Sequence, residues 1–186
     1  MKKLIIAVAA VAMGIAANAA SFTWKATSGY LYDGADTPEK ITSGTAYLLF
    51  ASALTQSDLV TAFAADAATA ASTVSTKAVS TGTIGSNARI AETAFTADVT
   101  TDQTAYFVVF NGDNMYVSGE TTAAYTAVGE ENIAFGSMSS SSKLKFDVAD
   151  GYSAAGWYGA AAVPEPTSGL LLLLGVAGLA LKRKRA

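Results

Sequence analysis

Three segments of the chain alternate hydrophobic and polar residues with a period of two: residues 21–26, 95–99 and 143–148. Successive side chains of a β-strand point to opposite faces, so this alternation predicts strands with one buried face. The last segment is the most regular, because Leu144, Phe146 and Val148 alternate with Lys143, Lys145 and Asp147. A shorter segment, Gly156-Trp157-Tyr158, is expected to belong to a final strand.

Two other segments, residues 46–50 and 106–110, are apolar throughout and rich in aromatic and branched side chains. Short continuous apolar runs of this kind predict central strands that are covered on both faces. Asn111-Gly112-Asp113-Asn114 follows the second run, and apolar character resumes at residues 115–117. Asn and Gly tolerate positive φ, so a hairpin turn between antiparallel strands is expected there.

One segment predicts a helix. Thr55 and Asp58 have the spacing of a capping box. An apolar stripe with helical spacing then follows at Leu59, Phe63 and Ala67. The Ala-rich sequence up to Ala71 also favours a helix by its intrinsic propensity. The predicted fold is therefore mainly β: an antiparallel, β-sandwich-like exported domain with one inserted helix. A serine run at residues 139–142 is expected to be a loop.

The N-terminus has the pattern of a signal peptide over residues 1–19. Lys2 and Lys3 are followed by an apolar stretch over residues 4–15. Small residues, Ala17 and Ala19, then occupy the positions that a signal peptidase recognises. Cleavage is expected before Ala20, which leaves residues 20–162 as the exported domain.

The C-terminal tail, residues 163–186, combines a rigid turn, an apolar run and a basic end. Residues 168–181 would span roughly 21 Å as a helix, somewhat less than the roughly 30 Å core of a bilayer. We expect them to form a short transmembrane helix, followed by a basic cytoplasmic end that sets its orientation. The basic residues are Lys182, Arg183, Lys184 and Arg185. The alternative, a buried core helix with a solvated end, is disfavoured because no polar face interrupts the apolar run.

The order of these features resembles the PEP-CTERM sorting signal of Gram-negative bacteria. The resemblance rests on Pro164, Glu165 and Pro166 before the apolar run and the basic end. It covers only the tail and implies recognition and removal by exosortase, a membrane-embedded enzyme. It also implies a membrane-anchored precursor that is delivered to the outer surface or the extracellular matrix. The partners that the resemblance implies are exosortase, transiently the inner membrane, and exopolysaccharide, and the N-terminal pattern adds signal peptidase.

Composition narrows the function of residues 20–162. This region holds six cations and fourteen acids, a net charge of −8, which disfavours nucleic-acid binding. The chain has no cysteine and no histidine, so disulfides, Ser-His-Asp triads and Cys-His pairs are excluded. We expect no catalytic residues, no metal site and no cofactor. Asn111, Asp113 and Asn114 offer oxygens for calcium but lack the spacing of an EF-hand.

The leading hypothesis is therefore a non-enzymatic protein of the cell envelope or matrix. The alternative is a carbohydrate-binding module in which exposed aromatic rings stack on sugars. A third hypothesis, a hydrolase, would need a pair of carboxylates, and adjacent acids on solvated loops more often have no catalytic role. The aromatic candidates are Trp24, Tyr30, Tyr32, Trp157 and Tyr158, and the carboxylate candidates are Asp33 with Asp36 and Glu130 with Glu131.

Overall fold

The two apolar runs form central strands, as predicted, and they are neighbours in the larger sheet. These strands are β2 (Thr45–Phe50) and β5 (Gln103–Asn111), which pair antiparallel with Leu48 opposite Phe107. Leu48 and Phe107 point into one core, whereas their neighbours Leu49 and Tyr106 point into another. Both faces of this sheet are covered, and this explains why the runs contain no polar residue.

The structure is a computed structural model that describes residues 19–35, 37–136 and 145–159. It is mainly β, with two sheets and two α-helices among the described residues. The other strands are β1 (Ala20–Ala26), β3 (Ser80–Thr83), β4 (Ile90–Ala97), β6 (Asn114–Val117), β7 (Thr121–Ala123), β8 (Glu130–Ala134), β9 (Lys145–Asp147) and β10 (Gly156–Gly159).

The smaller sheet has the strand order β4-β1-β8, and the larger has the order β3-β2-β5-β6-β10-β9, with β7 also paired to β5. Most pairs are antiparallel, but β1 pairs parallel with β8, and β10 pairs parallel with β9. The expectation of an antiparallel sandwich is wrong for these two pairs. Both join strands that are distant in sequence or separated by a loop, so no hairpin turn signals them.

Two helices stand where one was predicted. They are α1 (Gln56–Ala65) and α2 (Ala67–Lys77), and Thr55 caps the first by accepting a bond from the Asp58 amide at 3.1 Å. Asp66 ends α1 in an extended conformation and caps α2, accepting bonds from the amides of Ala68 and Thr69. Bonds from the Thr69 hydroxyl and these amides lower the pKa of Asp66. A side chain that competes for backbone amides thus breaks the helix.

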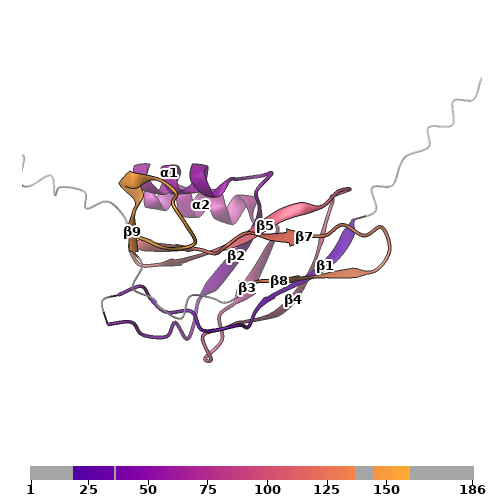
Figure 1. Cartoon of the computed structure of the whole chain (residues 1–186), viewed down its shortest axis with the longest axis horizontal. Helices are drawn as coiled ribbons and strands as arrows, with labels where there is room; N and C mark the ends of the chain where they lie inside the picture. The colour runs from indigo at the N-terminus through magenta and orange to yellow at the C-terminus, as the bar shows by residue number, and fades with distance from the viewer. Residues whose placement is uncertain (1–18, 36, 137–144, 160–186) are drawn as a thin grey trace, which may run out of the picture.

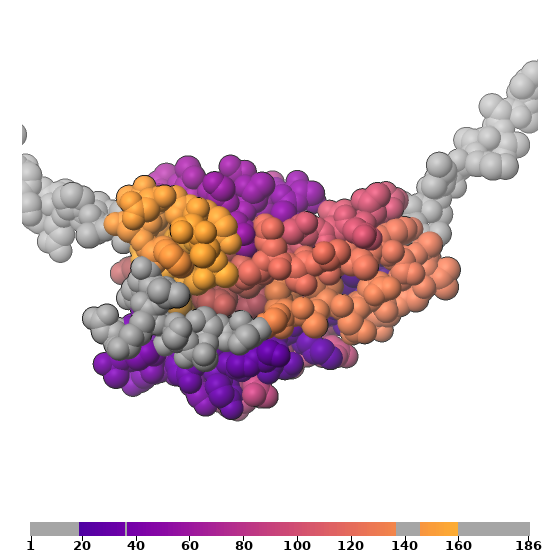
Figure 2. Space-filling model, in the orientation of Figure 1, coloured from indigo at the N-terminus to yellow at the C-terminus, as the bar shows by residue number. Residues whose placement is uncertain are grey.

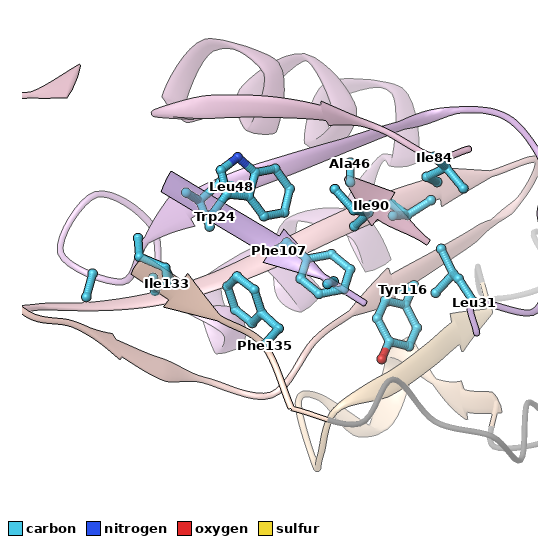
Figure 3. Packing of buried hydrophobic residues seen from close by; sticks show 14 of the residues in the cluster. Trp24, Leu31, Ala46, Leu48, Ile84, Ile90, Phe107, Tyr116, Ile133 and Phe135 are labelled. Atoms are coloured by element: carbon cyan, nitrogen blue, oxygen red, sulfur yellow. The ribbon is translucent and has the colours of Figure 1, made fainter. Parts of the chain in front are cut away.

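The elements form three layers (Figure 1): the smaller sheet, the larger sheet, and the two helices on the larger sheet's outer face. The first hydrophobic core lies between the sheets and contains Trp24, Phe107 and Phe135 (Figure 3). Phe107 lies 5.0 Å from Phe135 and 6.1 Å from Trp24 between ring centroids. The second core lies between the larger sheet and the helices, where Leu59, Phe63 and Val74 are buried.

The predicted hairpin is confirmed. β5 and β6 join through Gly112 and Asp113, with Asn111 opposite Asn114. Gly112 has φ of +56°, as the first central residue of a type II′ turn requires. The strand predicted over residues 143–148 is shorter, because β9 ends at Asp147 and a 3₁₀ turn begins at Val148. The expected loop at residues 139–142 lies outside the described residues.

In the part of the chain that the structure describes, no helix has the length and apolar character needed to cross a membrane. The transmembrane helix predicted for residues 168–181 lies outside that part, so it stays a prediction.

Gly34 allows the N-terminal loop to lie against the last strand. Its φ is +72°, and a Cβ atom at this position would lie 2.6 Å from Cγ of Trp157. We expect Gly34→Ala to lower the free energy of unfolding by about 2–5 kcal/mol, because left-handed strain and overpacking add together. Gly112→Ala is the matched control: its φ is also positive, but its Cβ would meet no atom within 4 Å. Its expected loss is about 1–2 kcal/mol, and equal losses in urea titrations would contradict the packing argument.

Candidate functional site

The first strand begins at the residue that is expected to follow signal-peptide cleavage. Ala20 is the first residue of β1, is 5 % exposed, and lies opposite Ala97 of β4. Ala19, immediately before it, is exposed. Ala17 and the rest of residues 1–18 lie outside the described residues. The predicted cleavage bond therefore joins an exposed residue to a buried one.

The last strand, β10, ends the described fold and is held on both of its faces. Trp157 is 2 % exposed in the core between the sheets, with its ring 5.5 Å from that of Tyr116. Tyr158 points the other way into the second core and is fully buried. Its ring lies 5.1 Å from Phe146 and 6.0 Å from Tyr152. Two adjacent aromatic residues thus fasten the chain just before the C-terminal tail.

The hydroxyl of Tyr158 adds a polar anchor to this strand. It donates to the carbonyl of Ala154 at 2.7 Å and accepts from the amides of Ser153 and Ala154 at 3.1 and 3.2 Å. Gly159, the last residue of β10, lies opposite Asn114 of the neighbouring strand β6, beside the β5–β6 hairpin. A force applied through the tail would therefore act on a strand that two cores and a local hydrogen-bond network hold in place.

The two ends of the described fold are far apart. β1 begins at one end of the long axis, and β9 lies at the other (Figure 1). Residues 145–159, coloured yellow-orange, gather at that second end (Figure 2). The sorting residues Pro164, Glu165 and Pro166, and the basic residues 182–185, lie outside the described residues. Pro164 follows Gly159 by five residues, which allows a separation of at most roughly 17 Å.

Comparison with known families identifies the tail. The family described as the PEP-CTERM protein-sorting motif matches residues 162–185. This match supports the resemblance seen in the sequence, and it indicates export and processing by exosortase at the membrane. It covers the C-terminal segment alone and does not extend to the folded domain. No curated protein and no solved structure matches the chain.

Most aromatic residues considered for sugar stacking are buried. Trp24 and Tyr158 are fully buried and Trp157 is 2 % exposed, so none of these three offers a ring face to a sugar. Tyr30 is half-buried, and Nζ of Lys40 lies 3.6 Å from the centroid of its ring. Tyr32 is half-buried and pairs with Lys40 through an isolated bridge. In sequence, a buried strand aromatic and an exposed stacking residue look the same.

The described carboxylates of the two candidate pairs lie in a strand and in a loop. Glu130 and Glu131 are consecutive residues of β8, so their side chains point to opposite faces of the sheet. Asp33 accepts bonds from the amides of Ala35 and Glu39, which stabilise its own loop, and Asp36 lies outside the described residues. Among the described residues there is no group of three or more His, Cys, Asp or Glu side chains that could hold a metal ion.

A cavity of about 190 Å³ lies where β6 and β7 diverge along β5. Three of its walls are the core aromatics Phe107, Tyr116 and Phe135, none more than 6 % exposed. Ser118, which also lines the cavity, forms hydrogen bonds with the backbone: its hydroxyl accepts from the Phe107 amide and donates to the Gly119 carbonyl. Gln56 of α1 donates to the Ser118 carbonyl at 2.7 Å. These contacts stabilise the divergence of the strands.

The sequence did not reveal the contacts that hold Ser118 and Gln56. The residues next to them in sequence do not indicate a buried contact. The Phe107 amide lies 11 residues from Ser118 along the chain, and Gln56 lies 62 residues from the Ser118 carbonyl to which it donates. The only signal present is the change from the apolar run 115–117 to a small polar residue. Such a change predicts a strand end but does not indicate a buried polar contact.

Proposed function

We propose that the chain is a non-enzymatic protein that exosortase releases from the inner membrane to the outer surface or the extracellular matrix. The observation that carries this proposal is the match of residues 162–185 to the PEP-CTERM protein-sorting motif. The motif stands immediately after a folded domain, and the last strand of that domain is anchored by Trp157 and Tyr158. Such an anchored end suits a domain that must stay folded while its tail is processed.

The proposal that the domain has no catalytic role is supported by what its polar residues do. The described carboxylates considered for catalysis bond within their own loop or lie on opposite faces of a strand. Ser118 and Tyr158 bond to nearby backbone groups. A catalytic group needs a reacting partner within hydrogen-bond reach, and Asp33, Ser118 and Tyr158 already have structural partners.

We propose exopolysaccharide of the matrix as the surrounding material, because the PEP-CTERM resemblance implies it. A dedicated carbohydrate-binding site is disfavoured because the candidate stacking residues Trp24, Trp157 and Tyr158 are buried. The proposed role is therefore that of a structural matrix component, in which the acidic net charge of residues 20–162 favours solubility.

Localisation with and without exosortase tests the proposal. Antibodies against residues 20–162 should detect the protein in the outer-surface and medium fractions of normal cells. In cells without exosortase, a longer form should accumulate in the inner-membrane fraction instead. A tail variant with residues 163–186 deleted is the matched control, because without the anchoring segment it should not accumulate in the inner membrane of either strain. An unchanged distribution in the exosortase-deficient cells would contradict the proposal.

A further inference from the structure

Strand β4 lies at one end of the smaller sheet, and a strand covers only one of its two backbone edges. β1 pairs with the inner edge from Ile90 to Ala97. On the outer edge, an isolated bridge joins Ile90 to Ile84, and in the described part of the chain no strand pairs with residues 91–97 beyond it. An edge of this kind is a template on which a further strand can pair.

Local hydrogen bonds define the middle of this free edge. The carbonyl of Ala91 accepts from the Thr93 hydroxyl at 3.2 Å, and the carbonyl of Ala97 accepts from the Val99 amide at 3.1 Å. The register with β1 is regular from Thr93 to Ala97, whereas it shifts just before Thr93. A partner strand would therefore pair with residues 93–97, which are centred on Phe95.

Behind this edge, apolar side chains of the core between the sheets are only partly covered. Phe95, Ala97 and Val99 are half-buried and pack against that core. The ring of Phe95 stacks on Phe22 with 5.3 Å between centroids and lies 6.4 Å from that of Phe50. Because alternate residues of a strand point to one face, a strand added at the edge would place its own side chains beside this row. The pairing would thus remove apolar surface from water.

The charge on β4 does not oppose a further strand. Its sequence contains no lysine and no proline, the residues that commonly protect an edge strand from pairing. Its one charged residue, Glu92, forms an ion pair with Lys25 of β1, with 2.7 Å between Oε2 and Nζ. This ion pair leaves the strand without an unbalanced charge.

The other strands at the ends of the two sheets are less suited to pairing. β8 has five residues and begins with two adjacent acids, Glu130 and Glu131. β3 has four residues and β9 has three. β4 has eight residues, so among these four strands it offers the longest edge without excess charge.

We propose that the outer edge of β4 is a self-association surface, on which β4 of a second copy of this chain pairs antiparallel about Phe95. The two smaller sheets then form one continuous sheet. In this register Ala94 lies opposite Thr96 of the second copy, and Phe95 lies opposite its own counterpart. One patch supplies both sides of such an isologous interface, and every facing pair over residues 93–97 is uncharged. The inference concerns the folded domain and does not depend on release by exosortase.

Lys25 gives the two copies a complementary contact, which favours a second copy as the occupant. Asp98 is exposed and follows β4 directly. When residues 93–97 pair antiparallel, Asp98 of each copy faces Glu92 of the other, which Lys25 already balances. The side chain of Lys25 is 39 % exposed, so its ammonium group can contact both carboxylates. Two such contacts, one at each end, fix the register of the pair.

Disulfide trapping tests this register. The chain has no cysteine, so an introduced cysteine is its only thiol. Ala94 and Thr96 are exposed, and residues that face each other in an antiparallel pair have Cβ atoms about 4.5–5.5 Å apart, close to the spacing that a disulfide bridges. Full-length Ala94→Cys and Thr96→Cys chains are mixed in mild detergent and oxidised with copper phenanthroline. We expect the mixed dimer to form several-fold faster than either variant crosslinks with itself.

Ala134→Cys is the matched control for trapping. Ala134 is an exposed alanine at the end of β8, the opposite edge of the same sheet. Crosslinking between Ala134→Cys and Ala94→Cys gives the rate of random collision in the same detergent. The mixture of Ala94→Cys and Thr96→Cys should exceed that rate several-fold.

A charge exchange tests the same contact without a covalent bond. Ala94→Lys/Thr96→Lys places lysines opposite each other, whereas Ala94→Lys/Thr96→Glu places lysine opposite glutamate. Like charges directly opposite destabilise an antiparallel pair and opposite charges stabilise it, so the double-lysine variant should have a dissociation constant about ten-fold higher. Sedimentation of both full-length variants in one detergent, at about 0.15 M salt to screen distant charges, measures the constants. Circular dichroism of both should match that of the natural chain.

General repulsion between acidic chains predicts the reverse order, because the double-lysine variant is the less acidic of the two. Equal dissociation constants for the two variants, or this reverse order, would overturn the inference. So would mixed crosslinking no faster than that of the Ala134→Cys control. Monomers of the natural chain at every concentration, the result if a segment of the same chain covered the edge, would overturn it as well.

Discussion

Replacing Pro164, Glu165 and Pro166 together by alanine is expected to leave the full C-terminal tail on the protein and the protein in the inner membrane. A proline fixes its own φ and disfavours helical geometry at the residue before it, here Val163 and Glu165. Alanine removes that constraint and favours helix, so the connector could continue the apolar segment as one helix. Exosortase would then lose both the side chains and the extended backbone that we expect it to recognise. Immunoblots of membrane and surface fractions measure the result, with near-complete loss of the shorter form expected.

The control for this triple variant is replacement of Thr167 and Ser168 by alanine. These residues follow the motif directly and carry no backbone constraint, so processing should continue. If the triple variant is shortened and exported like the natural protein, Pro164, Glu165 and Pro166 do not form the recognition element.

The second large effect is expected from Trp24→Ala. Trp24 is fully buried in the central strand of the smaller sheet, and its ring contacts those of Phe107 and Phe135. Truncation of a buried tryptophan to alanine removes apolar contacts and leaves a cavity, at a cost of about 3–5 kcal/mol. That is a large share of the roughly 5–15 kcal/mol that stabilises a domain. Urea unfolding of the processed protein, followed by far-ultraviolet circular dichroism, measures the loss.

Tyr30→Ala is the matched control for Trp24→Ala. Tyr30 is an aromatic residue that is half-buried, and its ring contacts are with the cations of Lys40 and Arg89. Its loss should cost about 1 kcal/mol, the usual scale of an exposed cation–π contact. A similar loss for both variants would mean that the core between the sheets does not dominate the stability of the domain.

The features that could be predicted from sequence depend on neighbouring residues. The apolar runs at 46–50 and 106–110 predict strands covered on both faces, because a strand buried on both sides needs apolar residues at every position. The hairpin at Asn111–Asn114 was predictable because the turn needs positive φ, which Gly112 supplies. The N-cap at Thr55 was predictable for a similar reason, since its partner amide is only three residues away.

The features that were missed depend on distant partners or on competing local bonds. Asp66 divides the predicted helix because its carboxylate accepts hydrogen bonds from the backbone amides of Ala68 and Thr69. Helix propensity alone does not include this competition for backbone amides. The parallel pair of β1 with β8 joins residues more than a hundred positions apart. Trp24 and Trp157 were candidates for stacking on sugar rings because the sequence does not show that they are buried. Their burial depends on the whole fold.

The candidate sites show the same division. The sorting motif could be found in sequence because exosortase recognises a contiguous segment, and the family match covers that segment. The accessibility of the Ala19–Ala20 bond could not be predicted from sequence, because it depends on the pairing of β4 and β8 with the two edges of β1.

The most direct test of the central claim, that the C-terminal tail is a sorting signal removed during export, is the intact mass of the protein recovered from the cell surface. The account predicts the mass of a polypeptide that begins at Ala20 and lacks the basic residues Lys182–Arg185. A surface protein whose mass still includes Lys182 through Ala186 would contradict it.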